Sequence, residues 1–183
     1  MGIIEDNLQV AIEGEFNAIQ KYTEFAAIAE AEHMPNVAYI FKGLIGGEMI
    51  HLANHKRALG EDFTPELKDF KSGTTLENLK TAFAAETWEY KEMYPSLIKS
   101  IKKESSEKGK IAKLSMNWAK DVEITHAEVL RLVIVNVEQG NDFDLAEKLW
   151  VCQACGNLFI GDNPNKMCPV CKHSAEFYKE VPK

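Results

Sequence analysis

Two segments of the chain combine a glutamate and a histidine at a spacing that suits a metal site. Glu48 is followed three residues later by His51, and Glu123 is followed three residues later by His126. Residues three apart lie on one face of a helix, so a carboxylate and an imidazole can bind the same pair of metal ions. A third such pair, at residues 30–33, ends just before a proline, and we expect it to face solvent.

Three further glutamates fall inside the segments that we expect to form the other two helices. They are Glu15, Glu86 and Glu89. Two Glu-x-x-His motifs, together with glutamates from two other helices, form the ligand set of di-metal carboxylate bundles. Burying carboxylates alone would be costly, and two divalent cations offset that cost. The alternative is that these glutamates simply face water.

The four cysteines form a second candidate metal site near the end of the chain. They occur as two Cys-x-x-Cys pairs separated by 12 residues: Cys152, Cys155, Cys168 and Cys171. Two such pairs can supply four thiolates to one tetrahedral metal ion. The spacing alone favours a structural zinc over a single iron that transfers electrons. A pair of disulfides is less expected in a reducing compartment.

The elements that must position these residues are four long helices. Apolar residues at three- and four-residue steps predict helices that end before Pro35, then run from about 36 to 59, 75 to 104 and 110 to 139. Thr74 and Glu77 have the pattern of a capping box, and Pro95 should kink the third helix. The connections are short, long and short, which is typical of two helical hairpins joined by a crossover. The predicted fold is mainly α, a ferritin-like four-helix bundle.

The helical pattern disappears after residue 149, where Gly, Pro, Asn and Cys occur together. About 40 residues bury too little apolar surface to fold without a staple, and the four cysteines can supply one. We therefore predict two domains, a bundle over residues 1–145 and a metal-stapled domain over residues 146–183. We expect the bundle to have a core of its own.

Several residues near the proposed ligands allow two interpretations. Tyr22 and Tyr94 should point roughly towards the ligands, and either could hydrogen-bond a carboxylate or simply pack in the core. His55 could support the site, but the two basic residues that follow it favour a solvent-exposed position. Glycine is costly inside a helix, so the Gly46-Gly47 pair indicates a local need for space. A metal site or a tight helix crossing would explain it equally well.

Composition excludes several classes of function. The 183 residues are 45% apolar and 27% charged, as expected for a folded protein, and the net charge of −7 disfavours nucleic acid and anionic membranes as partners. No apolar run is long enough to span a membrane. The first residues lack the features of a secretory signal, so we expect a cytoplasmic protein.

Taken in order along the chain, these motifs resemble the rubrerythrin family over essentially the whole sequence. The local contexts at residues 21–23, 92–95 and 168–171 are also similar to that family's. The resemblance implies a non-haem di-iron site and a rubredoxin-type iron bound by the four cysteines. The implied ligands of the di-iron site are Glu15, Glu48, His51, Glu86, Glu89, Glu123 and His126.

The resemblance also implies an activity, the reduction of hydrogen peroxide to water in protection against oxidative stress. Electrons would come from a reduced nicotinamide through a separate reductase or rubredoxin, since the chain has no Rossmann fingerprint of its own. That role favours iron over zinc in the cysteine site, although zinc could replace it. The alternatives are a ferritin-like ferrous iron oxidase or store, and a non-enzymatic electron carrier or metal-stabilised binding module.

Two structural features follow from the same resemblance. The family forms dimers in which the tail of one chain approaches the bundle of the other, so we expect a homodimer, in which helix pairs could be exchanged through the 60–74 crossover. One iron should also exchange Glu89 for His51 on reduction. Ferric iron favours anionic oxygen, whereas ferrous iron readily binds a neutral imidazole.

Overall fold

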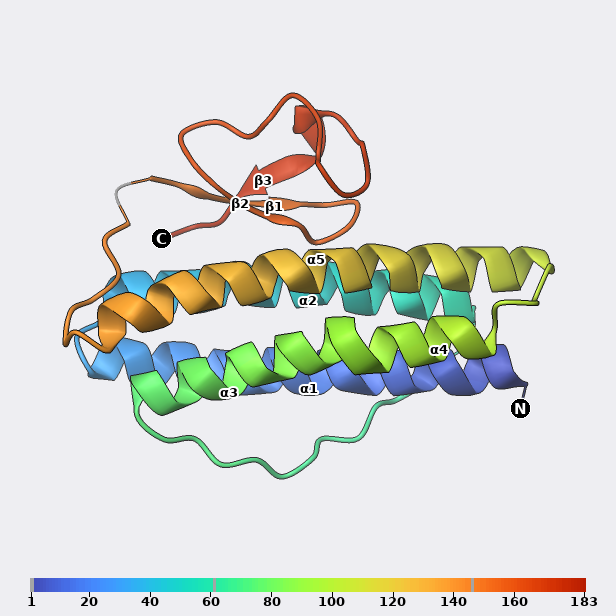
Figure 1. Cartoon of the computed structure of the whole chain (residues 1–183), viewed down its shortest axis with the longest axis horizontal. Helices are drawn as coiled ribbons and strands as arrows, with labels where there is room; N and C mark the ends of the chain where they lie inside the picture. The colour runs from blue at the N-terminus through green and yellow to red at the C-terminus, as the bar shows by residue number, and fades with distance from the viewer. Residues whose placement is uncertain (1, 61, 146) are drawn as a thin grey trace.

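The computed structural model describes residues 2–60, 62–145 and 147–183 and contains a four-helix bundle with a small domain lying on one side of it (Figure 1). The helices are α1 (Ile3–Ala31), α2 (Pro35–Leu59), a third helix made of α3 (Thr75–Trp88), η1 (Glu89–Met93) and α4 (Tyr94–Ser100), and α5 (Glu107–Val137). The predicted fold class is confirmed. None of the helices in the described part of the chain combines the length and apolar composition that crossing a membrane requires.

The helix boundaries have local causes that the sequence predicted. Pro35 occupies the first turn of α2, where its missing N–H costs nothing, and Gly60 ends that helix with a φ of 71°. Thr74 and Glu77 form the predicted capping box at the start of α3. The third helix ends at Ser100, four residues earlier than predicted.

The third helix is interrupted where the sequence predicted a kink. Residues Glu89–Met93 form one turn of π-helix between α3 and α4, and Pro95 follows in the first turn of α4. Pro95 has no N–H to donate to the preceding turn, so an ordinary α-helix could not continue unbroken through this point. The interruption takes the form of a π turn, which adds one residue to the helix locally.

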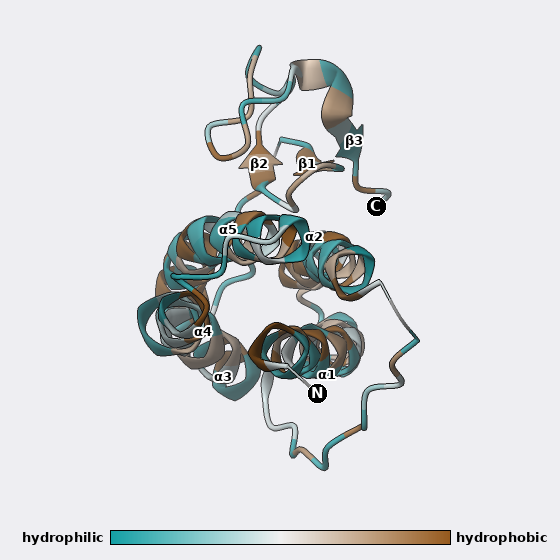
Figure 2. Ribbon diagram, turned by 90° about the vertical axis from the view of Figure 1, so that its right-hand side faces the viewer, coloured by the Kyte–Doolittle hydropathy of each residue, from teal (hydrophilic) through white to brown (hydrophobic). Residues whose placement is uncertain are grey.

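Two hydrophobic clusters fill the bundle, one towards each end, around the axis seen in Figure 2. Along α1, Ile12 belongs to one cluster and Tyr22 to the other, and Glu15 lies between them. Along α2, Leu44 and Ala58 flank Glu48 and His51 in the same way. The polar residues of the proposed site therefore occupy the middle of the bundle, with apolar packing on both sides.

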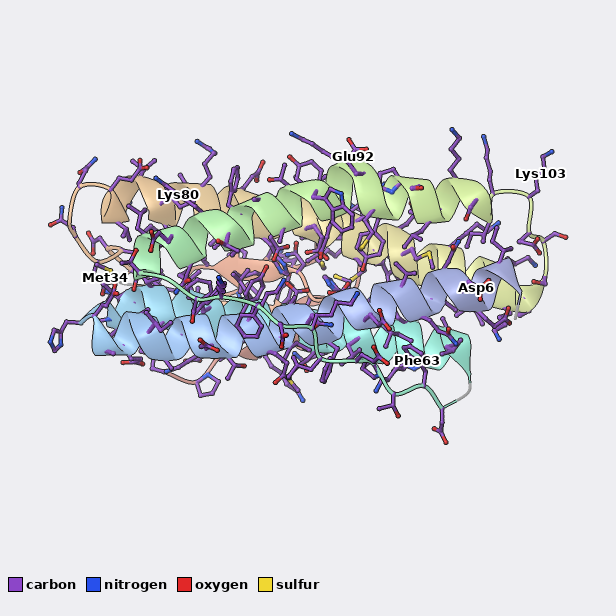
Figure 3. All side chains as sticks on the ribbon, turned by 90° about the horizontal axis from the view of Figure 1, so that it is seen from below. Asp6, Met34, Phe63, Lys80, Glu92 and Lys103 are labelled. Atoms are coloured by element: carbon purple, nitrogen blue, oxygen red, sulfur yellow. The ribbon has the colours of Figure 1, made fainter. Side chains whose placement is uncertain are left out.

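The long crossover between α2 and α3 runs along the outside of α1 (Figure 3). Asn17 holds it there, because its side chain donates to the Glu66 carbonyl at 2.9 Å and accepts from the Lys68 backbone N–H at 2.8 Å. Phe63 and Phe70 pack against the two hydrophobic clusters. The crossover thus links the two helical hairpins within one chain.

The C-terminal domain contains a three-stranded antiparallel sheet in the order β2-β1-β3. Its strands are β1 (Leu149–Cys152), β2 (Leu158–Ile160) and β3 (Tyr178–Glu180), and a short 3₁₀ turn, η2 (Ala175–Phe177), precedes β3. The predicted boundary between residues 145 and 146 falls at a residue outside the described part of the chain.

The C-terminal domain shares its core with the bundle. Leu149, Val151, Leu158 and Val181 are buried in the same cluster as Phe41 of α2. The bundle has a core of its own in one cluster, whereas the other cluster also includes side chains of the C-terminal domain. These four side chains complete one of the two clusters.

Candidate metal centres

Seven acidic and histidine residues meet at the middle of the bundle. They are Glu15 of α1, Glu48 and His51 of α2, Glu86 of α3, Glu89 of η1, and Glu123 and His126 of α5. All seven are buried, so the alternative that these glutamates face water is wrong. The third Glu-x-x-His pair, at residues 30–33, is exposed as expected.

The ligand atoms fall into two groups that share two carboxylates. One group contains Glu15, Glu48, His51 and Glu123, and the other contains Glu48, Glu86, Glu123 and His126. Within each group the atoms lie within 4.8 Å of one another. Two overlapping sets of this kind are what a pair of metal ions with two bridging carboxylates requires.

The unpartnered oxygens distinguish bridging carboxylates from terminal ones. Both oxygens of Glu48 and both of Glu123 are buried without a hydrogen-bond partner, whereas only Oε2 is unpartnered in Glu15 and in Glu86. Buried polar atoms without partners are rare and need an explanation. Two cations provide one here, because Glu48 and Glu123 could each give one oxygen to each metal.

The two imidazoles point into the same space. His51 Nδ1 lies 2.9 Å from Glu48 Oε2 and 3.0 Å from Glu123 Oε1, and His126 Nδ1 lies 3.2 Å and 3.0 Å from the other oxygens of these two carboxylates. Despite these distances, neither Nδ1 makes a hydrogen bond of acceptable geometry. Atoms that approach closely without pairing converge on a point between them, as metal ligands do. The residues present therefore fit a di-iron site.

Glu89 stands apart from both groups. It belongs to neither set of converging atoms, and it is 8% exposed whereas the other six residues are at most 1% exposed. Glu89 and Tyr22 line a cavity of about 220 Å³ between α1 and α3. Gly14, Ala18 and Ala85 also line this cavity, and their small side chains leave the space between the two helices open.

The electrostatics of the cluster also call for cations. Burial raises the pKa of Glu48, and the nearby charge of Glu86 raises it further. Burial and the charge of Glu48 likewise raise the pKa of Glu123 well above its usual value. Carboxylates so close together cannot all ionise without positive charge between them, and two divalent metal ions supply it.

Each terminal carboxylate is held by a tyrosine. The Tyr22 hydroxyl donates to Glu86 Oε1, and the Tyr94 hydroxyl donates to Glu15 Oε1. Both tyrosines are buried. Of the two interpretations that the sequence left open, the hydrogen bond to a ligand carboxylate is the one found for both residues.

His55 is completely buried, so the expectation of a solvent-exposed side chain is wrong. Its Nε2 lies 2.9 Å from the Tyr94 hydroxyl, and its Nδ1 lies 2.7 Å from Ser115 Oγ on α5. The basic residues after His55 lie on other faces of α2, so they say little about its position. Sequence reasoning missed Ser115, and a lone serine eight residues before Glu123 gives no usable signal.

The four cysteines also converge. Cys152 Sγ and Cys171 Sγ are 3.6 Å apart, as are Cys155 Sγ and Cys168 Sγ, and all four Sγ atoms lie within 4.8 Å of one another. Metal–sulfur bonds of about 2.3 Å in a tetrahedron place the sulfurs about 3.8 Å apart. The observed cluster therefore fits one metal ion bound by four thiolates.

A direct hydrogen bond links the two candidate metal centres. His51 Nε2 lies 3.0 Å from the carbonyl oxygen of Cys155, so one imidazole joins a ligand position of the bundle to a cysteine of the tail. The adjacent Asn54 donates to the Ala154 carbonyl at 2.9 Å. These contacts are made within one chain, whereas the sequence resemblance led us to expect contact between the tail of one chain and the bundle of another.

Glycines allow this close approach. A Cβ on Gly47 would lie 2.9 Å from the Gly156 carbonyl and 2.7 Å from His126 Cε1, which real Cβ atoms do not tolerate. A Cβ on Gly46 would lie 3.2 Å from the Val151 side chain. The Gly46-Gly47 pair therefore leaves room both for the His126 ring and for the docked C-terminal domain.

Together these features define a class of protein, a di-metal carboxylate bundle that carries a four-cysteine metal domain. A family model described as Rubrerythrin matches residues 6–134, and one described as "Rubrerythrin, rubredoxin-like domain" matches residues 150–179. The chain belongs to the rubrerythrin family. Candidate di-iron and rubredoxin-like sites are thus both present in this chain.

Individual relatives cover nearly the whole chain. The rubrerythrin of Porphyromonas gingivalis is 28% identical over 181 residues, which are 97% of this chain and 89% of that protein. Nigerythrin of Nitratidesulfovibrio vulgaris is 27% identical over 175 residues, covering 93% and 83% of the two chains.

Solved structures share the fold. Fully reduced nigerythrin, described as all ferrous, superposes with a TM-score of 0.85 at 24% identity and covers 98% of this chain and 87% of its own. Reduced symerythrin from Cyanophora paradoxa superposes with a TM-score of 0.65 at 20% identity, covering 75% and 87%.

Proposed function

We propose that the protein reduces hydrogen peroxide to water at the bundle site, with electrons entering through the four-cysteine domain. The observation that carries the proposal is the hydrogen bond from His51 Nε2 to the Cys155 carbonyl, because it connects the two centres through one ligand side chain. A protein that only stored iron would have no need for an electron inlet so close to the site.

The proposed ligands follow the two groups of converging atoms. Glu48 and Glu123 would bridge two irons, and the cysteines of the tail would hold a third. The terminal ligands would be Glu15 and His51 on one side, and Glu86 and His126 on the other. Iron would supply two electrons from the bundle site for each peroxide, replaced one at a time through the four-thiolate site.

The chain's own residues would prepare the site for peroxide. The cavity beside Glu89 offers a route from the surface, and Glu89 is the most exposed acidic residue of the cluster. Reduction of one peroxide consumes two electrons and two protons and releases two water molecules. A carboxyl group at the inner end of the cavity is suitably placed to pass protons inward.

The arrangement of Glu89 and His51 supports the exchange of these two ligands on reduction. His51 is inside the converging group and Glu89 is outside it, as expected for the reduced state. We expect Glu89 to bind metal in oxidised crystals and His51 to replace it after chemical reduction of the same crystals. Equal binding of His51 in both states would contradict the exchange.

The proposal is tested with anaerobically purified protein loaded with three irons per chain. Chemically reduced protein should be oxidised much faster by one equivalent of peroxide than by oxygen. A faster reaction with oxygen would instead favour the ferrous oxidase. Metal analysis and the visible spectrum of the same sample distinguish iron from zinc in the cysteine site.

The electron inlet is tested separately with Cys171→Ser. This variant should lose the colour of the thiolate-bound iron and retain the single reaction with peroxide. Steady turnover with a rubredoxin or a nicotinamide-dependent reductase as donor should collapse. Undiminished steady turnover would show that electrons do not need to enter through the four-cysteine domain.

The chain is also proposed to form a homodimer, which sedimentation of the unmodified protein tests.

A further inference from the structure

We propose that Ser115 and His55 are positioning residues that fix the direction of the hydrogen bond from Tyr94 to Glu15, and so make one metal position of the bundle unlike the other. The inference concerns metal binding, so it goes beyond the proposed peroxidase and does not depend on it. It rests on the geometry of a buried chain of four side chains.

The four side chains connect α5 to the metal site. Ser115 Oγ lies 2.7 Å from His55 Nδ1, His55 Nε2 lies 2.9 Å from the Tyr94 hydroxyl, and that hydroxyl contacts Glu15 Oε1. His55, Tyr94 and Glu15 are fully buried, and Ser115 is 6% exposed. Helices α1, α2, α4 and α5 each contribute one residue, so the chain of contacts crosses the whole bundle.

Counting protons fixes the direction of every bond in this chain. A carboxylate that binds a metal ion is ionised, so Glu15 can only accept. The Tyr94 hydroxyl therefore donates its single proton to Glu15 and must accept a hydrogen bond from His55 Nε2. A neutral imidazole with a proton on Nε2 has an acceptor at Nδ1, so Ser115 is the donor there. The structure thus assigns one tautomer to His55.

The two carboxylate oxygens of Glu15 therefore differ in their hydrogen bonding. Oε1 accepts from Tyr94, whereas Oε2 is buried without a hydrogen-bond partner and is therefore free to bind a metal ion. Hydrogen bonds in series strengthen one another, so the bond from His55 makes Tyr94 a firmer anchor. The first metal position therefore receives a terminal oxygen that is held in place before the metal arrives.

The second metal position lacks this support. Tyr22 donates to Glu86 Oε1 in the same way that Tyr94 donates to Glu15. Within the described residues, however, no side chain donates to the Tyr22 hydroxyl as His55 does to Tyr94. The Ser115–His55 pair therefore adds an asymmetry between the two metal positions, beside the contact of His51 with the Cys155 carbonyl.

The tautomer is tested by NMR of the zinc-loaded protein labelled with ¹⁵N in its histidines. We expect His55 to show a protonated Nε2 and an unprotonated Nδ1. A proton on Nδ1, or on both nitrogens, would overturn the assignment. Zinc keeps the protein diamagnetic, and the NMR measurement does not depend on catalytic turnover.

The asymmetry is tested by zinc titration in competition with a chelator, using the His51 and His126 resonances to follow the two metal positions separately. Ser115→Ala should weaken zinc binding at the His51 position by about tenfold and change the His126 position by less than about twofold, since partners of metal ligands commonly contribute this much. Ser115→Thr keeps the hydroxyl and should restore the affinity. Tyr22→Phe is the matched control and should weaken the His126 position instead.

Two results would overturn the proposal. One is equal weakening of both positions by Ser115→Ala, which would indicate a general effect on the bundle. The other is a Ser115→Thr variant that binds zinc as weakly as Ser115→Ala, because the hydroxyl would then have no part in positioning Glu15. His55→Phe, which keeps the size of the ring, should reproduce the Ser115→Ala pattern.

Discussion

Single glycines decide how closely the tail can approach the metal site. A Cβ on Gly47 would collide with His126 and with the Gly156 carbonyl, whereas a Cβ on Gly14 would meet only Met93 Sδ at an ordinary 3.9 Å. Gly47→Ala should therefore destabilise the protein by about 1–3 kcal/mol. Gly14→Ala, in a comparable helical position, should stabilise it by up to about 1 kcal/mol. Urea unfolding measures both, and stabilisation by Gly47→Ala would contradict the close contact.

Glu89 shows how the acidic cluster lowers the stability of the fold when the bundle site holds no metal. Burial, and then the charges of Glu15 and Glu123, raise its pKa well above the usual value. The stability that this carboxyl contributes is complete below the pKa of the unfolded chain, about 4.3, and is lost as pH rises towards the folded pKa. Gln cannot ionise. Glu89→Gln should therefore stabilise protein with an empty bundle site by at least about 1 kcal/mol at pH 7, and the gain should vanish near pH 4.

Urea unfolding at pH 4, 5.5 and 7, with zinc retained in the cysteine site, measures this effect. The control is Glu92→Gln, which lies on an exposed side of the same turn and should change stability by less than about 0.5 kcal/mol. A gain from Glu89→Gln that is independent of pH would refute the electrostatic explanation.

At this scale the sequence indicated which ligand-type side chains converge in the bundle, but not the contacts that support them. Glu48, His51, Glu123 and His126 were identifiable because helical spacing alone puts the paired side chains on one face. The link from His51 to Cys155 was not, because it joins residues 104 apart in the chain. His55 was assigned to solvent from its charged neighbours, although it lies seven residues after Glu48 and so shares the inward face of α2.

At the scale of elements, helix ends were predictable and the π turn was not. Caps and prolines act locally, so the sequence alone indicates them, as Gly60 and Thr74 show. The π turn at Glu89–Met93 instead depends on a long-range requirement, because it sets the direction in which Tyr94 points. In an unbroken α-helix, eight residues would turn Tyr94 about 80° away from Glu86. The extra residue of the π turn reduces this to about 20°, which brings Tyr94 back towards the metal site.

The strands of the C-terminal domain cover part of the bundle core. A chain ending at Lys148 loses Leu149, Val151 and Leu158, and each buried apolar side chain of this size contributes about 1.5–3 kcal/mol. The shortened chain should unfold at a lower temperature and bind a hydrophobic dye. A chain ending at Val181 loses only exposed residues and is the control. Equal stability of the two chains would show that the bundle does not need this cover.

At the scale of the whole molecule, the metal in the tail should stabilise the bundle. The tail is too small to fold without its staple, and its apolar side chains complete the bundle core. Cys171→Ser should therefore lower the melting temperature of the helices by at least about 5 °C, in a single transition. Circular dichroism measures this, with Met167→Ser at an exposed position as the control. An unchanged helical transition would mean that the two parts unfold independently.

The contacts of the Tyr39 hydroxyl affect how the protein folds during its synthesis. It accepts from the Leu149 backbone N–H at 3.3 Å and donates to the Val181 carbonyl at 2.8 Å, so it contacts residues 110 and 142 positions further along the chain. Contacts this far apart in sequence form late. As the chain leaves the ribosome, the apolar face around Phe41 stays uncovered until residues 149–181 have also been made. Until those residues emerge, this apolar face is open to binding by a chaperone.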